Sequence, residues 1–179
     1  MIQSILYELA HAPEPALRRL VACDPDADPV VLLLLAYDPD PVVRRTLARR
    51  AAVPWTVWVA LARDSSSTVR RTVAAHPAVP SPILAALAHD AAISVRLKVA
   101  AHPNTDVPTL TQLADDPQVL VRLTLTARDQ IPLDVLQRLA SADDDRAVRR
   151  ASLKRVAPEA VIPGRAPSRP APRRRRVSS

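Results

Sequence analysis

An apolar residue followed by arginine recurs at nearly constant spacing along the chain. These pairs are Leu17-Arg18, Val43-Arg44, Val69-Arg70, Val95-Arg96, Val121-Arg122 and Val148-Arg149. Successive arginines are 26 residues apart, and the last interval is 27. A fixed period of about 20 to 50 residues is typical of solenoids, so this pattern predicts a stack of short repeated units.

Each unit carries two short apolar stripes with helical spacing. In the unit 67–92, STVRRTVAAHPAVPSPILAALAHDAA, apolar residues at unit positions three, seven and eight fit one helix, and those at seventeen, eighteen, twenty-one and twenty-two fit a second. The stretch HPAVPSP between them cannot be continuous helix, because proline lacks the amide donor and restricts the residue before it. Pro54, Pro80 and Pro132 lie where a second helix would begin, which proline tolerates. We therefore expect an all-α solenoid of two-helix units.

The ends of the chain depart from the period. ILYELA at residues 5–10 aligns with ILAALA at 83–88, so residues 1–14 are expected to be a capping half-repeat. Five full units and a degenerate terminal unit are expected over residues 15–158, because Ser152 occupies a column that is otherwise aliphatic. Residues 159–179, rich in proline and arginine, cannot bury enough apolar area to fold and are expected to form a disordered basic tail.

Composition narrows the class of protein. Of 179 residues 48% are hydrophobic, enough for a sizeable core, and the net charge of +7 is concentrated in residues 159–179, which hold six arginines and one glutamate. The single cysteine, Cys23, excludes an intramolecular disulfide and is expected to be a small buried side chain in a reducing cytoplasm. The N-terminal segment lacks the basic region of a signal peptide, and the longest apolar run, 29–37, is too short to cross a bilayer.

Acidic residues accompany the repeated arginines. The pairs six residues apart are Asp38 and Arg44, Asp64 and Arg70, Asp90 and Arg96, Asp116 and Arg122, and Asp143 and Arg149. Catalysis would need one convergent site, whereas five copies favour a ladder of charge-assisted bonds between adjacent units. A phosphate-tracking stripe is the alternative.

The chain offers little that is typical of a catalytic, cofactor or metal site. His76 and His102 share one column before proline, where histidine can bond the carbonyls at a helix end, and no close cluster of metal-ligand type surrounds them. A single glycine excludes a glycine-rich phosphate loop. We therefore expect a protein that is not an enzyme and has no cofactor; a HEAT-like base-excision enzyme would need a carboxylate set in an aromatic pocket, which is not recognisable.

A patch of apolar residues departs from the repeat and is the strongest candidate for a protein-binding site. Its residues lie in the second helices of the first two full units: Leu33, Leu34, Tyr37, Trp55 and Val59. Trp58, by contrast, falls in a core column. An exposed apolar patch with aromatic anchors is typical of an interface. The N-terminal helix or a second copy of the chain could also cover it.

An alternative function is nucleic-acid binding through cations. Candidate residues are Arg19, Arg45 and Arg71 in one repeat column, and Arg173, Arg174, Arg175 and Arg176 in the tail. Leu97 and Leu123 interrupt the repeat column, so a continuous basic track is not expected. The tail could equally contact acidic proteins or an anionic membrane, or remain solvated.

Residues 1 to about 157 resemble the leucine-rich repeat variant family of bacterial proteins. Units of that family read roughly D-x-x-x-x-V-R-x-x-V-A-x-x-P-x-x-P-x-x-x-L-x-x-L-A, and HEAT repeats are similar more distantly. The resemblance implies a right-handed superhelix in which α-helices alternate with shorter, often 3₁₀, segments. Some members carry an iron–sulfur cluster in a cysteine-rich N-terminal segment, which this chain lacks. We therefore expect a scaffold that binds a protein partner through one face.

Overall fold

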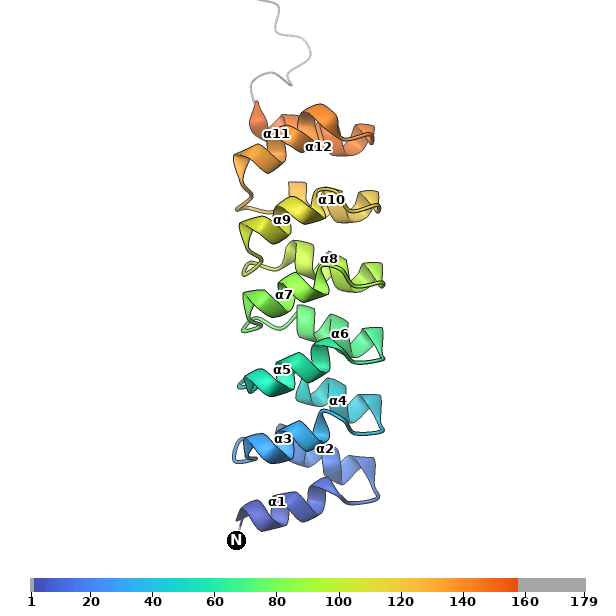
Figure 1. The fold of residues 1–179 in the computed structure, drawn as a ribbon, viewed down its shortest axis with the longest axis vertical. Coiled ribbons are helices and arrows are strands. Elements are labelled where there is room, and N and C mark those ends of the chain that lie inside the picture. Colours follow the sequence, from blue (N-terminus) through green and yellow to red (C-terminus); the bar gives the residue numbers. More distant parts are fainter. Residues whose placement is uncertain (1, 158–179) are drawn as a thin grey trace, which may run out of the picture.

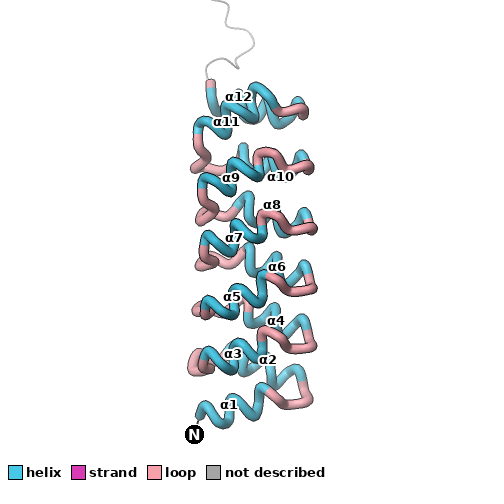
Figure 2. Tube along the Cα trace, in the orientation of Figure 1, coloured by secondary structure: helices cyan, strands magenta, loops and turns pink. Residues whose placement is uncertain are grey.

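The computed structural model describes residues 2–157, which form twelve α-helices and contain no β-strand (Figures 1 and 2). In chain order the helices are α1 (Ile2–Ala10), α2 (Pro15–Cys23), α3 (Pro29–Leu35), α4 (Pro41–Leu47), α5 (Trp55–Ala62), α6 (Ser67–Ala74), α7 (Ser81–Leu87), α8 (Ile93–Ala101), α9 (Val107–Leu113), α10 (Val119–Thr126), α11 (Leu133–Ala142) and α12 (Arg146–Val156). The predicted tail lies outside the described residues.

The helices form two layers that rise together as one stack. Followed upward in Figure 1, the chain crosses the front in α1, α3, α5, α7, α9 and α11 and returns behind in the even-numbered helices, which is a right-handed path. Helices pack on the next helix of their own layer, as α2 does on α4 and α3 on α5. The predicted all-α solenoid of two-helix units is thus confirmed.

Proline and aspartate start many of the helices. Pro15, Pro29 and Pro41 stand in the first helical turn, where a missing amide donor costs nothing. The carboxylates of Asp28 and Asp40 cap α3 and α4 by accepting backbone amides of the first turn. The shorter segments implied by the resemblance are all α-helical in the described residues, and even the shortest of them hold seven residues.

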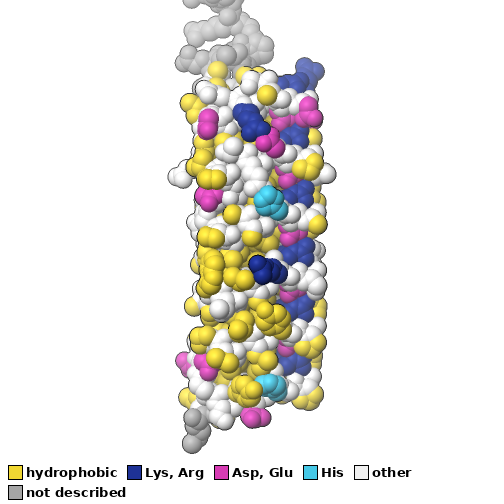
Figure 3. Space-filling model, viewed as in Figure 1, with side chains coloured by type: hydrophobic (Ala, Val, Ile, Leu, Met, Phe, Trp, Pro, Cys, Tyr) yellow, Lys and Arg dark blue, Asp and Glu magenta, His cyan; other side chains and the backbone are white. Residues whose placement is uncertain are grey.

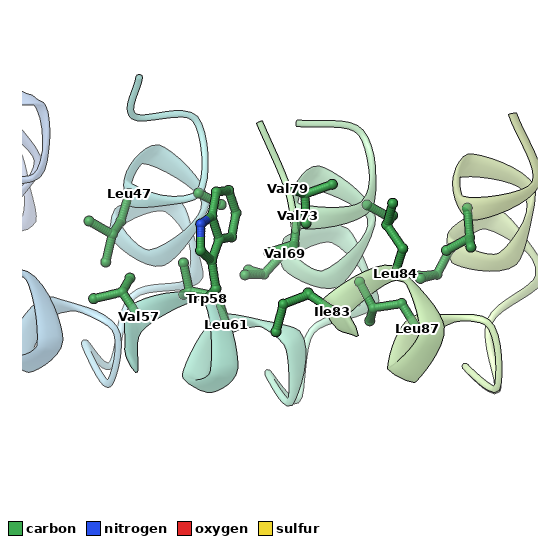
Figure 4. Packing of buried hydrophobic residues seen from close by; sticks show 14 of the residues in the cluster. Leu47, Val57, Trp58, Leu61, Val69, Val73, Val79, Ile83, Leu84 and Leu87 are labelled. Carbon is green, nitrogen blue, oxygen red and sulfur yellow. The ribbon is translucent and has the colours of Figure 1, made fainter. Parts of the chain in front are cut away.

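The core is a continuous apolar layer between the two rows of helices. In Figure 4, Val69 and Val73 of α6 point toward Ile83, Leu84 and Leu87 of α7. The same columns are filled in every full unit, so each unit completes the core of its neighbours and none is buried alone. The terminal unit differs as the sequence predicts. Its Ser152 is fully buried in α12, and its hydroxyl has no hydrogen-bond partner among the described residues.

Candidate binding faces

The repeated arginines form a ladder with the repeated aspartates, though not with the pairing expected from the sequence. Nε of Arg44 donates to Oδ2 of Asp64 at 2.6 Å and Nη2 donates to Oδ1 at 2.9 Å, so the ion pair spans 20 residues. Nη1 of Arg44 donates at 2.6 Å to the backbone carbonyl of Asp38, the aspartate six residues earlier. Arg18, Arg70, Arg96 and Arg122 repeat this arrangement. The six-residue spacing brings each arginine to a carbonyl of the preceding unit, whereas the carboxylate comes from the arginine's own unit.

Each aspartate of this ladder is held from two sides. Oδ1 of Asp90 accepts from Nη2 of Arg70 at 2.9 Å and from the amide of Ala92 at 2.8 Å. Burial alone would raise the pKa of Asp90, but these hydrogen bonds and the charges of Arg70 and Arg96 hold that pKa below its ordinary value. The Asp90 carboxylate raises the pKa of Arg70 in turn through their hydrogen bonds, against the opposing effect of burial. The ladder arginines are therefore engaged in ion pairs that hold the stack together.

A second ladder runs along the column of His76 and His102. Nδ1 of His76 accepts from the amide of Ala78 at 3.1 Å, so Nε2 carries the proton and donates at 2.9 Å to the carbonyl of Arg50. Nε2 of His102 donates in the same way to the carbonyl of His76 at 3.0 Å. Arg50, Arg128 and Arg155 continue the column with guanidinium donors to the carbonyl one unit earlier. The prediction that these histidines bond helix-end carbonyls is confirmed, and the carbonyls belong to the preceding unit.

His102 is thus held as a neutral structural donor. Burial lowers the pKa of His102, and the nearby charge of Arg128 adds to this, while the bond to the carbonyl of His76 opposes it. Across residues 2–157, no three histidine, cysteine or acidic side chains are grouped so that they could hold a metal ion. Within the same residues, no helix combines the length and apolar character needed to cross a bilayer.

The apolar patch predicted from the sequence is exposed only in part. Tyr37 is 73% exposed, Trp55 53% and Leu34 38%, whereas Leu33 and Val59 are half-buried against the core. We call these five residues the aromatic patch; hydrophobic side chains gather over α3 and α5 in Figure 3. Helix α1 packs on α2 and α3 and yet leaves Tyr37 and Trp55 exposed, so the N-terminal helix does not cover the patch.

The members of the aromatic patch are brought together by helix geometry. Trp55 and Val59 are four residues apart on α5, and Tyr37 follows the end of α3. Tyr37 and Val59 line one hollow of about 480 Å³ between the two helices, together with Ala60 and Arg63. Val30, 69% exposed at the start of α3, extends this apolar surface. The sequence comparison missed Val30, although its column carries Thr56, Pro82, Pro108 and Asp134 in later units and should have marked it as a departure from the repeat.

Trp58 faces the core, as its column predicts. It is 3% exposed, and its ring meets that of His76 edge-on, with centroids 5.0 Å apart. The patch therefore owes its aromatic character to Trp55 and Tyr37 alone.

The even-numbered helices present a different face, in which cations are the only charged side chains. Their outward positions, the second, fifth, sixth and ninth of each unit, hold no acidic residue in any of the six described helices. The cations at those positions are Arg19, Arg45, Arg49, Arg71, Lys98, Arg150 and Lys154. None of them forms an ion pair with a described residue.

Four of these cations line two adjoining hollows across α2, α4, α6 and α8. The larger, about 870 Å³, contains Arg49, Arg71 and Lys98; the smaller, about 590 Å³, contains Arg19 and shares Arg49. We call the two hollows together the cationic groove. Of the predicted column, Arg19 and Arg71 line the groove and are exposed, whereas Arg45 is half-buried outside it. Comparing one column at a time missed Arg49 and Lys98; taking all outward columns together would have found them.

Cys23 also lies in the groove, and the expectation that it is buried is wrong. It is exposed at the end of α2 and lines the smaller hollow. Its position is the ninth of the unit, where the neighbouring units place the exposed Arg49 and Ala75. The outward direction of this position outweighs the general tendency of cysteine to be buried.

Two stretches of the chain, residues 68–92 and 94–118, match the family model described as leucine rich repeat variant. They correspond to α6–α7 and α8–α9. A solved structure described as "A leucine-rich repeat variant with a novel repetitive protein structural motif" is 26% identical over 85% of this chain and 70% of that chain, with a TM-score of 0.45. None of the curated proteins with which this chain was compared matches its sequence.

Proposed function

We propose that this chain, whose repeats belong to the leucine rich repeat variant family, is a non-catalytic scaffold that binds a protein partner through the aromatic patch. The observation that carries the proposal is the exposure of Tyr37 and Trp55 on neighbouring second helices. Repeat solenoids build extended surfaces from stacked units, and their function depends on which side chains decorate them. The reducing cytoplasm is the compartment we propose for it, because the one cysteine is unpaired.

The energetics favour these residues as anchors. Tyrosine and tryptophan bury large areas at interfaces and lose few rotamers on binding. Val59 lies one helical turn from Trp55 and lines the same hollow as Tyr37, and both Val59 and Leu33 are half-buried against the core. The hollow between α3 and α5 is lined by Tyr37 and Val59 and also by charged residues such as Asp38 and Arg63, so it offers a place for a partner side chain that has both apolar and polar groups.

The experiment compares three forms of the full chain as bait. Wild type, Trp55→Ala and Leu133→Ala are immobilised, and captured proteins are quantified by mass spectrometry. Leu133 occupies the position of Trp55 three units further on and is 58% exposed, which makes it a matched control. A hot-spot truncation costs about 2 kcal/mol, so Trp55→Ala should weaken capture of the partner about thirtyfold. Leu133→Ala should leave capture unchanged.

Equal capture by Trp55→Ala and wild type would refute the aromatic patch as the binding site. Sedimentation of the chain alone tests the alternative that a second copy of the chain occupies the patch. If the chain dimerises and Trp55→Ala makes it monomeric, a second copy covers the patch, and the proposal of a different protein partner is wrong.

A further inference from the structure

The cationic groove lies on the layer of even-numbered helices and is separate from the aromatic patch on α3 and α5. We propose that it binds an extended acidic segment of a partner polypeptide. This surface would give the chain a second docking site, used independently of the first.

The charges of the groove are available to a ligand. Arg19, Arg49, Arg71 and Lys98 are exposed, and within residues 2–157 no acidic side chain lines either hollow. The ladder arginine beside Arg71 is Arg70, whose guanidinium is bound to Asp90. In such a pair of neighbouring arginines, one therefore forms an ion pair within the chain, and the other forms none with a described residue. Guanidinium groups pair with carboxylates through two parallel hydrogen bonds, which gives both affinity and direction.

The floor of the groove favours a polypeptide. It consists of small and apolar side chains between the cations, including Ala48, Ala51, Ala75, Pro77 and Ala78. A polypeptide that alternates acidic and small apolar residues places one side chain on the rim and the next on the floor, because successive side chains of an extended chain point to opposite sides. A phosphodiester backbone has no apolar group to fill this floor.

Two further features disfavour nucleic acid on this face. Among the described residues, no aromatic side chain other than His76 lines the groove, so bases have little to stack on. Leu97 and Leu123 replace the column arginine after α6, so the cations do not follow the stack from end to end, as a duplex backbone would require.

The length of the ligand follows from the spacing of the helices. The groove crosses from α2 to α8, which is three steps between packed helices of about 8–10 Å each. An extended chain covers about 3.3 Å per residue, so about nine residues reach from Arg19 to Lys98. A probe of about twelve residues is therefore long enough.

The test measures binding of a fluorescein-labelled peptide of about twelve residues, alternating Asp and Ala, to the full chain by fluorescence anisotropy. The groove variant is Arg49→Glu with Arg71→Glu. The control variant is Arg150→Glu with Lys154→Glu, which makes the same change in net charge at exposed positions of the same two columns outside the groove. Each variant is also made with Arg173, Arg174, Arg175 and Arg176 replaced by Ser, which removes binding to the tail.

We expect the groove variant to bind the peptide at least tenfold more weakly than wild type, and the control variant to bind it within twofold. Equal weakening in both variants, no binding by wild type, or binding that disappears with the tail arginines would overturn the proposal. So would tighter binding of a DNA duplex of equal charge that the groove variant abolishes, which would assign the groove to nucleic acid.

Cys23 supplies a second measurement that needs no substitution. It is the only cysteine, it is exposed, and it lines the smaller hollow. Saturating peptide should slow alkylation of Cys23 by a maleimide at least fivefold in the wild-type chain. An unchanged rate would place the peptide outside the groove. Loss of the protein partner in Trp55→Ala leaves both measurements unaffected, so the two proposals fail separately.

Discussion

Trp55 and Trp58 illustrate how position within the unit decides what a side chain does. The two residues are of one type, three positions apart on the same helix, yet one is half exposed and the other is enclosed by the core. Their columns predict this difference, because the column of Trp58 is apolar in every unit, whereas that of Trp55 is not. Residue type alone would have assigned both to the core.

Stability measurements should separate the two tryptophans. Trp58→Ala leaves a cavity beside His76 and should lower the free energy of unfolding by about 3–5 kcal/mol, measured by urea denaturation. Trp55→Ala should change it by less than about 0.5 kcal/mol, as surface substitutions usually do. A large loss in Trp55→Ala would make that side chain structural and remove the main support for the aromatic patch.

His102 should make stability depend on pH. Because burial holds its folded pKa below the ordinary value of 6.5, the unfolded chain takes up a proton more readily than the folded one. The contribution is therefore fully present above pH 6.5 and is lost as the pH falls below it. Chemical denaturation at a series of pH values should show this slope. His102→Gln should reduce the slope, and an identical slope in the variant and the wild type would contradict the assignment.

At the scale of the helix pair, the two ladders and the apolar core determine different properties of the packing. The core columns specify that units stack, but aliphatic contacts tolerate sliding of one helix along another. Each ladder arginine and histidine donates to backbone carbonyls of the preceding unit, as Arg70 does to Asp64 and His76 does to Arg50. Hydrogen bonds have strict distances and angles, so the ladders fix the register in which successive units pack.

Arg70 and its neighbour Arg71 provide a matched test of the ladder. Arg70→Ala leaves the buried carboxylate of Asp90 without its ion-pair partner and should cost about 3 kcal/mol of unfolding free energy. Arg71→Ala removes an exposed cation with no described partner and should cost less than about 0.5 kcal/mol. Both are measured by urea denaturation. Equal losses would mean that the bidentate pair contributes nothing beyond a surface charge.

For the whole molecule, the period alone predicted the architecture. Valines and leucines recurring every 26 residues leave no other way to bury one stripe per helix than to stack the units. The cationic groove was harder to predict, because it depends on which outward columns lie side by side. Arg49 and Arg71 are in different columns of different units, and only the packing of α4 on α6 brings them to one hollow. The partner of each ladder arginine was missed for a similar reason, since a spacing along the chain does not distinguish a carboxylate from a carbonyl.

The modular stack should tolerate removal of one whole period. Deleting residues 67–92 joins α5 to α8 and offers Arg96 the carbonyl of Asp64 and His102 that of Arg50, which are equivalent to the acceptors they lose. The shortened chain should fold cooperatively, with a smaller urea m-value and a lower Tm, followed by circular dichroism. Deleting residues 67–79, half a period, should abolish cooperative unfolding. If both deletions behave alike, the units are not interchangeable.

The ladder bonds that join successive units all run in one direction along the chain. Each arginine of the first ladder and each member of the second donates to a carbonyl of the unit before it, never to one after it. A unit leaving the ribosome therefore finds its acceptors already in place, and it needs nothing from residues not yet synthesised. The architecture suits folding in the order of translation, with each finished unit acting as the template for the one that follows.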